Sequence, residues 1–232
     1  MLTNRPPVLP AVLISIALAA PGLAAAVDAP ALYAAKCALC HEFFQGHGGN
    51  RVKETQVCAM CHVPNLSSSG RGANVANLTA ANAAALTAAG FDATNPATWP
   101  EKSMNFKDLI HSTHASGKRV KPYEFVRDRG TSGVFFYDMS EVTFPGVLSD
   151  CETCHNPGTF NIDVMPSSVL PSTDVISDGT GTTTVAQDRA SLPNATDLVI
   201  SPVTAACIAC HDTGVAAIHT QQNGGSAGVP RQ

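Results

Sequence analysis

The pattern Cys-x-x-Cys-His occurs four times in this chain and uses all eight of its cysteines. The copies are Cys37/Cys40/His41, Cys58/Cys61/His62, Cys151/Cys154/His155 and Cys207/Cys210/His211. In this pattern the two thiols attach to one porphyrin through thioethers, and the histidine takes one axial position of its iron. The motifs therefore predict four covalently bound c-type haems.

Three other kinds of site use a Cys-x-x-Cys pair: a zinc site, a disulfide framework and a thioredoxin-like redox pair. With eight histidines in 232 residues, a histidine would follow a given pair by chance only roughly 3% of the time. The thioredoxin interpretation also needs a βαβ pattern, which the sequence around the motifs lacks. The histidines therefore favour haem.

The N-terminal residues have the pattern of a secretory signal peptide. Arg5 is a short basic start, residues 8–20 are almost entirely apolar, and Ala24-Ala25-Ala26 is a small-residue cleavage site. The apolar stretch is shorter than the ~20 residues that span a bilayer, so a membrane anchor is the weaker interpretation. We expect residues 1–26 to be removed and the protein to be exported to the periplasm, the outer-membrane surface or the extracellular space.

Composition limits how the remaining residues, 27–232, can fold. The chain is only 6% aromatic, whereas a domain of this size must bury much apolar surface to offset its conformational entropy. Four porphyrins would supply that surface. We expect one tetrahaem domain with a multihaem cytochrome c fold, mostly irregular with short α-helices and little β-structure, in which the haems form the core and the haem-free chain is largely unfolded.

Two segments between the motifs are rich in small and polar residues. Residues 67–103 and 166–197 are predicted to be long loops or insertions, the first with a short helix at 78–89. Residues 135–144 have the aromatic and β-branched content of a strand or hairpin.

Four histidines lie outside the motifs, one for each haem that lacks a second axial ligand: His47, His111, His114 and His219. The rival ligand, methionine, is too scarce, because only Met104, Met139 and Met165 lie outside the motifs and the predicted signal peptide. Bis-histidine ligation is therefore predicted, and it usually gives a lower potential than His/Met ligation.

Local context supports three of these four histidines. His111 and His114 fall in a helical pattern at a spacing of three, which places both rings on one face and would let the helix bridge two neighbouring haems. His47 lies among glycines that permit a tight turn close to a porphyrin. His219 is the least supported, since its alternative is a solvated histidine near a flexible C-terminus.

The net charge of the chain limits the classes of partner that it can bind. The formal net charge is −4, and haem propionates would make the protein more acidic, which disfavours nucleic acid and anionic membranes as partners. The basic residues cluster after the two-histidine helix, at Lys118, Arg119, Lys121, Arg127 and Arg129. They are either a solvated patch or partners for propionates.

The motifs and their surroundings carry a family resemblance. Residues 47–51 read His-Gly-Gly-Asn-Arg, 58–65 read Cys-Ala-Met-Cys-His-Val-Pro-Asn, and 105–114 read Asn-Phe-Lys-Asp-Leu-Ile-His-Ser-Thr-His. Residues 144–150, just before the third motif, read Phe-Pro-Gly-Val-Leu-Ser-Asp. The order of these segments and of the residues at the end of the chain resembles the outer-membrane decahaem cytochromes of the OmcA/MtrC family. The resemblance implies electron transfer to minerals such as metal oxides, to flavins or to other multihaem cytochromes.

The chain also departs from that family, whose haem domains carry five motifs where this chain has four. A stand-alone tetrahaem relative and a truncated product are both compatible with the sequence. One iron could then be five-coordinate or could take a histidine from a neighbouring subunit.

Three hypotheses follow for function. The first is an electron carrier with no catalytic residues, in which closely spaced haems form a conducting chain. The second is a multihaem reductase that acts on a small oxyanion or metal at one open iron. The third is a homopolymer, in which such subunits stack into an extracellular filament.

Overall fold

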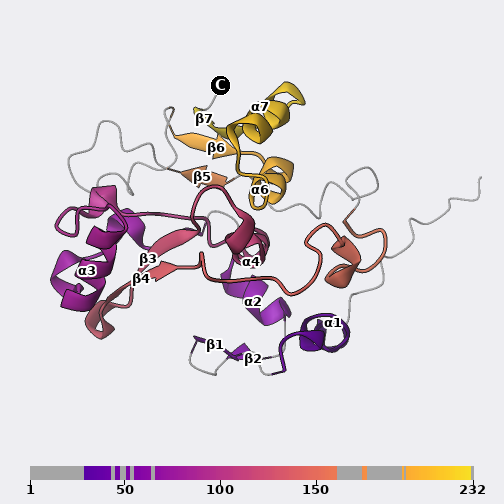
Figure 1. Ribbon diagram of the computed structural model, residues 1–232, viewed down its shortest axis with the longest axis horizontal. Helices are drawn as coiled ribbons and strands as arrows, with labels where there is room; N and C mark the ends of the chain where they lie inside the picture. The colour runs from indigo at the N-terminus through magenta and orange to yellow at the C-terminus, as the bar shows by residue number, and fades with distance from the viewer. Residues whose placement is uncertain are drawn as a thin grey trace, which may run out of the picture.

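The computed structural model describes residues 29–42, 45–47, 51–52, 55–63, 66–160, 174–176, 195 and 197–230. Within these ranges the chain forms short helices and three small antiparallel sheets joined by long connections (Figure 1). The predicted signal peptide and most of the predicted loop 166–197 lie outside the described residues.

The helices and strands are short throughout. The α-helices are α1 (Ala29–Ala35), α2 (Thr55–Cys61), α3 (Ala80–Ala88), α4 (Phe106–Ala115), α6 (Pro202–Ile208) and α7 (Gly214–Gln222). The 3-10 turns are η1 (Cys37–Leu39), η3 (Gly70–Gly72), η4 (Val75–Asn77), η5 (Pro96–Thr98), η6 (Ser116–Lys118), η7 (Gly130–Ser132) and η8 (Cys151–Thr153). The strands are β1 (Gln45–Gly46), β2 (Arg51–Val52), β3 (Glu124–Asp128), β4 (Val134–Asp138), β5 (Asp174–Ile176), β6 (Leu198–Ile200) and β7 (Ala227–Pro230).

Helix α4 confirms the helix predicted across the two neighbouring histidines. Its N-cap is Asn105, whose side-chain oxygen accepts the N–H of Lys107 at 3.2 Å. Asp108 in the first turn complements the positive end of the helix. The helix lies at the centre of the molecule, between the β3–β4 hairpin and the C-terminal helices (Figure 1).

The β3–β4 hairpin separates two hydrophobic clusters. Phe125 pairs with Tyr137 and Val126 with Phe136, and successive side chains of a strand point to opposite faces. One face contributes Val126 to a cluster with Leu86 and Trp99, and the other contributes Phe125 to a cluster with Met104 and Tyr123. The strand predicted within residues 135–144 is present as β4, but its partner β3 precedes it in the chain.

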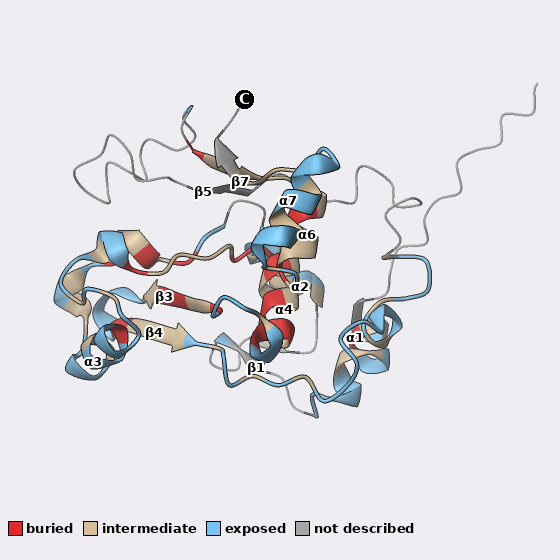
Figure 2. Ribbon diagram, turned by 45° about the horizontal axis from the view of Figure 1, so that its top comes forward, coloured by how far each residue is buried: buried red, intermediate tan, exposed pale blue. Residues whose placement is uncertain are grey.

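Residues 67–103 form much of the first cluster. The predicted helix at 78–89 is confirmed as α3, which begins where the Thr79 hydroxyl accepts the N–H of Asn82. Leu86 on this helix is fully buried, and Trp99 is only 2% exposed. The buried residues of the described chain lie mainly in this region and around α4 and α6 (Figure 2). The motifs at η1, α2 and η8 contribute no residue to either apolar cluster.

Candidate functional site

All four Cys-x-x-Cys-His motifs adopt the same turn. In each one the histidine N–H donates to the carbonyl of the first cysteine, at 2.9 Å in the first two motifs and 2.8 Å in the last two. This hydrogen bond joins residues four apart, as in one turn of α-helix. Residues at positions i, i+3 and i+4 of a helical turn share one face. Both thiols and the imidazole can therefore reach a single planar group.

The eight cysteines lie at or near the surface, and they form no disulfide. Unmodified cysteine is one of the most often buried residue types, yet none of these eight is buried. The partly exposed members are Cys37, Cys58, Cys207 and Cys210, and the exposed members are Cys40, Cys61, Cys151 and Cys154. Within the described residues, no three His, Cys, Asp or Glu side chains converge as a metal-ligand cluster. The geometry resembles neither a disulfide framework nor a zinc site.

Cys40 is exposed and lies at the end of η1, where its N–H donates to the Cys37 carbonyl at 3.2 Å. The chain's own apolar clusters form around the hairpin and α4. That Cys40 attaches a haem, and that the haems form the core, stay predictions.

The thiols of the first and third motifs lie close enough to affect each other. Partial burial raises the pKa of the Cys37 thiol, and the neighbouring Cys154 and Cys58 raise it further. Burial likewise raises the pKa of Cys154, and the nearby Cys40 thiol adds to this effect. The two motifs are thus neighbours in space although 110 or more residues separate them in the chain.

Three motif histidines face a histidine from outside the motifs. The ring centroids of His41 and His114 are 6.0 Å apart, those of His62 and His47 are 5.9 Å apart, and those of His155 and His111 are 6.0 Å apart. An imidazole nitrogen lies roughly 2 Å from the metal it binds, so two rings on opposite sides of one metal have centroids about 6 Å apart. The three separations match this geometry.

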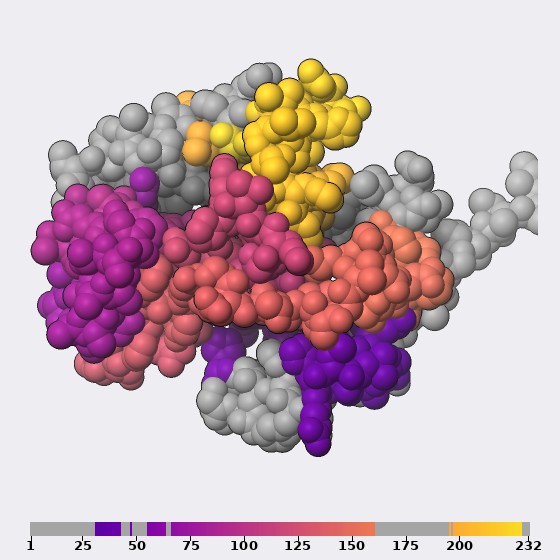
Figure 3. Space-filling view, in the orientation of Figure 1, coloured from indigo at the N-terminus to yellow at the C-terminus, as the bar shows by residue number. Residues whose placement is uncertain are grey.

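Helix α4 supplies two of these rings to two different motifs. His111 faces the third motif and His114 the first, as a spacing of three on one helix permits. The two motifs are also joined directly, because the Lys36 amine donates to the Glu152 carbonyl at 2.6 Å. Figure 3 shows the segment around the third motif lying against the N-terminal segment.

Two of the paired rings are held with one nitrogen directed at a backbone carbonyl. His62 Nδ1 lies 2.7 Å from the Met104 carbonyl, and His114 Nδ1 lies 2.8 Å from the Ile110 carbonyl. A carbonyl only accepts, so the Nδ1 atoms carry the protons and the Nε2 lone pairs are left available to a metal. Metal-binding histidines usually have such a partner.

Burial lowers the pKa of two of the paired histidines, His111 and His155, and His111 is the more buried of the two. Burial, reinforced by His155 and Lys107, lowers the pKa of His111 to about 4, so its ring is neutral near pH 7. Among the residues that the structure describes, its buried Nδ1 has no hydrogen-bond partner, which is costly for a polar atom unless another group completes its environment. A neutral imidazole is the form that binds a metal.

His47 is held in an unusual backbone conformation. It lies between the short strands β1 and β2 with a φ of 51°, a left-handed value that is uncommon for residues other than glycine. The Arg127 guanidinium lies 3.4 Å from its Nδ1. The turn predicted from the glycines around His47 falls largely outside the described residues, because Gly48 and Gly49 are not described.

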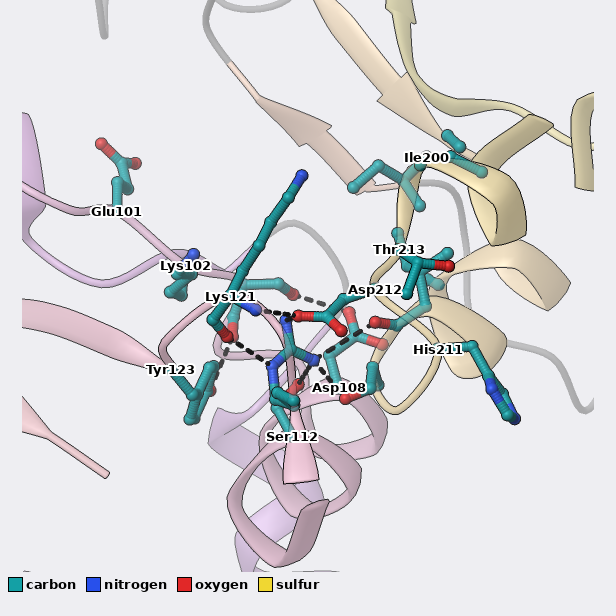
Figure 4. A pocket seen from close by; sticks show the side chains of 18 residues that line it. Glu101, Lys102, Asp108, Ser112, Lys121, Tyr123, Ile200, His211, Asp212 and Thr213 are labelled. Atoms are coloured by element: carbon teal, nitrogen blue, oxygen red, sulfur yellow. Dashed lines mark hydrogen bonds and ion pairs between the residues drawn. The ribbon is translucent and has the colours of Figure 1, made fainter. Parts of the chain in front are cut away.

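The fourth motif differs from the other three. His211 and His219 are both exposed, and within the described residues neither ring pairs with another histidine. Figure 4 shows the His211 side chain extending away from the pocket that Lys121, Ser112 and Asp212 line. His219, the predicted ligand, lies on α7.

A buried ion pair fixes the fourth motif to the end of α4. Arg119 lies 3.5 Å from Asp212, which directly follows the motif, and the two side chains are 8% and 6% exposed. Arg119 also donates to the carbonyls of Ile208 and Ala209 at the end of α6. Asp212 accepts the N–H groups of Val120 at 3.0 Å and Lys121 at 2.6 Å. Burial alone would raise the pKa of Asp212, but these N–H donors and Arg119 outweigh it and lower that pKa.

Sequence reasoning missed this ion pair, which we call the Arg119–Asp212 latch. Arg119 was placed in a basic cluster whose members were either solvated or paired with propionates. In the structure Arg129 of that cluster donates to the Tyr137 hydroxyl at 2.7 Å, and Arg127 lies beside His47. An aspartate next to the motif was the one signal for the latch, and nothing local in the sequence identified its partner.

Large apolar side chains are exposed chiefly around the motifs. Leu39 is 73% exposed, Met60 77% and Val215 77%. The others of this kind are Val63, Leu66, Val120, Val147, Leu148 and Ile218. All except Val120 lie within seven residues of a motif. An apolar group bound at the motifs would remove this surface from water, so the residues present fit covalently attached haem.

A family comparison agrees with this geometry. A model of the family described as outer membrane cytochrome MtrC/MtrF-like, domains II/IV, matches residues 31–231. The chain belongs to this family. The predicted resemblance to the OmcA/MtrC type is thereby confirmed. No curated protein and no solved structure matches the chain.

Membership defines the general function. MtrC/MtrF-like proteins are outer-membrane cytochromes that bind several c-type haems, transfer electrons outside the cell and exchange them with other cytochromes and extracellular acceptors. Among the described residues of this member, no helix is long and apolar enough to cross a membrane.

The latch can be tested by removing its cation. Replacing Arg119 by leucine leaves Asp212 buried without its counter-ion, which should lower the free energy of unfolding by about 3 kcal/mol. The exposed neighbour provides the control, because K118L should change stability by no more than about 0.5 kcal/mol. Denaturant unfolding measures both. The double variant R119L/D212L should recover part of the loss, and strictly additive losses would contradict a direct interaction.

Proposed function

We propose that this chain is an electron-transfer protein with four c-type haems, one on each motif. The observation that carries this proposal is the set of three histidine pairs at 5.9 to 6.0 Å. The ligand pairs are then His41/His114 for the first haem, His62/His47 for the second and His155/His111 for the third. When bound, the haems supply one-electron chemistry.

The protein's own residues close the three paired sites. At each paired site two imidazoles would hold the haem, which would leave no open position for a substrate, and the Nδ1 contacts of His62 and His114 hold two of these rings in place. Such a site can exchange electrons but cannot bind and transform a ligand. The donors and acceptors we propose are other multihaem cytochromes, metal oxides and flavins outside the cell.

Contacts between the motifs support an order for the haems. The second motif adjoins the first, because α1 packs against α2. The first adjoins the third through α4 and the Lys36 contact. The third adjoins the fourth, since Cys210 Sγ lies 4.0 Å from the carbonyl of His111, a ligand of the third haem. The proposed order is therefore second, first, third, fourth, which differs from the order in the sequence.

An experimental structure of the haem-loaded protein tests this order. The nearest iron neighbours should be the second and first haems, the first and third, and the third and fourth. If the shortest iron-to-iron distance were between the second and third haems, the proposed order would be wrong, because His111 and His114 on α4 place the first and third haems side by side.

Histidine variants test the ligand pairs. H47A, H111A and H114A should each convert one low-spin haem to a form that binds carbon monoxide when reduced, because each removes one axial ligand. Absorption and EPR spectra count the low-spin haems, and intact mass shows whether all four remain attached. A variant that keeps four haems and gains no carbon monoxide site would contradict its pair.

A second function is supported by one observation, that His211 and His219 are not paired in the described chain. We propose as the alternative that the fourth motif would hold a haem with His211 as its one histidine ligand, where a small ligand would bind and be reduced by electrons from the other haems. Reduced wild-type protein should then bind one carbon monoxide per chain, and H219A should leave that number unchanged. If wild-type protein binds none and H219A binds one, His219 is the fourth distal ligand and the reductase is excluded.

The exposed apolar residues predict where haem stabilises the fold. In a variant with all eight cysteines replaced by serine, the segments around the motifs should exchange amide hydrogens rapidly, because their apolar surface stays in water. The β3–β4 hairpin and α3 should keep more protection, since Leu86 and Val126 are buried among protein side chains. Hydrogen exchange against the haem-loaded protein measures this. Equal protection in both would show that haem is not part of the core.

A further inference from the structure

The three histidine pairs differ in the angle between their rings. The ring planes of the first pair, His41 and His114, make an angle of 75°. The planes make 38° in the pair at the second motif and 34° in the pair at the third. An imidazole binds a metal in the plane of its ring. When two rings bind opposite sides of one metal, the angle between their planes is therefore the angle between the two ligands about their common axis.

Two contacts orient the ring of His114. Its Nδ1 lies 2.8 Å from the Ile110 carbonyl, one turn earlier in α4. The ring of Phe144 lies 5.9 Å from it, centroid to centroid, with the planes at 87°, which is the T-shaped arrangement that aromatic pairs favour. The hydrogen bond fixes the position of one ring atom, and the Phe144 contact fixes the tilt of the ring plane. Such outer contacts set the orientation of a metal-binding histidine.

The backbone holds Phe144 beside the end of α4. After strand β4 the Met139 carbonyl accepts the N–H of Val142 at 2.9 Å, and the Val142 carbonyl accepts the N–H of Gly117 at 3.1 Å. Gly117 lies two residues beyond the end of α4. A β-carbon at position 117 would lie 2.8 Å from the Val142 oxygen, so this close approach requires glycine. The segment that carries Phe144 is thus fixed to the helix that carries His114.

The angle between two axial imidazoles changes the energies of the iron orbitals between them. Each ring donates into the iron d orbital that is perpendicular to the ring plane. Near-parallel rings raise the same orbital, whereas near-perpendicular rings raise one orbital each and leave the two close in energy. Oxidation removes an electron from the higher orbital, so parallel rings favour the oxidised form and perpendicular rings favour the reduced form. Two orbitals close in energy also give the ferric form a strongly anisotropic EPR signal.

We propose that Phe144 holds His114 nearly perpendicular to His41 and thereby raises the reduction potential of the haem on the first motif above those on the second and third. Phe144 is a positioning residue and not a ligand, and its role rests on the ligand pair His41/His114 proposed above. In the proposed order the first haem lies between the second and the third. An electron shared among these three is therefore found mainly on the middle one.

The experiment is EPR of the oxidised, haem-loaded protein together with a spectroscopic redox titration. Wild-type protein should show a strongly anisotropic low-spin signal that disappears in H114A. F144L removes the aromatic ring and should convert this signal to a less anisotropic one, with one reduction step moved to lower potential. F144Y keeps the ring and should retain both the wild-type signal and the wild-type step.

F160L is the matched control. Phe160 also contacts a paired histidine, His155, with centroids 6.0 Å apart, but the rings of that pair are closer to parallel. This variant should leave the strongly anisotropic signal and its reduction step unchanged. The proposal is overturned if F144L keeps the signal, or if F160L changes it as much as F144L does. If F144L loses haem, F144M replaces it, and if both lose haem, Phe144 is needed for attachment and its role in orientation is excluded.

Failure of this proposal is distinguishable from failure of the proposed function. If intact mass shows no haem, or if H114A leaves every haem low-spin, the ligand pair itself is wrong. If H114A opens one haem to carbon monoxide but removes no strongly anisotropic signal, the pair stands and the perpendicular orientation is excluded. If H114A removes that signal and F144L does not, the orientation stands and only the role of Phe144 is excluded.

Discussion

The structure depends on one helix that reaches two motifs far apart in the sequence. His111 and His114 of α4 face the third and the first motif. The carbonyl of Met104, which precedes the N-cap of this helix, accepts the Nδ1–H of His62. The far end of α4 leads to Arg119, which holds the fourth motif through Asp212. All four motifs are therefore positioned by α4 or by residues that flank it. The position of this helix thus determines how the motifs lie relative to one another.

This arrangement explains how a chain with few large apolar side chains can form a folded domain. The protein's own clusters occupy the hairpin, α3 and the α4–α6 contact. Around the motifs, exposed residues such as Leu39 and Met60 leave an apolar surface that porphyrins would cover. Folding and cofactor attachment are then linked, since the same groups that conduct electrons would also complete the core.

Local patterns predicted local structure well. The helical pattern around His111 and His114 correctly indicated α4, and the helix predicted at 78–89 is α3. The Cys-x-x-Cys-His spacing indicated a site whose turn is the same in all four copies. The strand near Phe135 was also indicated, but its partner was not, because pairing depends on residues that precede it by a turn. The latch was missed because Arg119 and Asp212 are 93 residues apart in sequence and only packing brings them together.

The sequence by itself determined the chemistry: eight thiols and four of the eight imidazoles in a repeated spacing, and membership of a multihaem cytochrome family. Spacing encodes which groups lie on one turn, because bonded geometry acts over a few residues. Only the tertiary structure decided which histidine faces which motif, that His219 faces none within the described chain, and that Arg127 lies beside His47. Those pairings join residues up to 80 positions apart, and they depend on how the hairpin and α4 pack, which no local pattern contains.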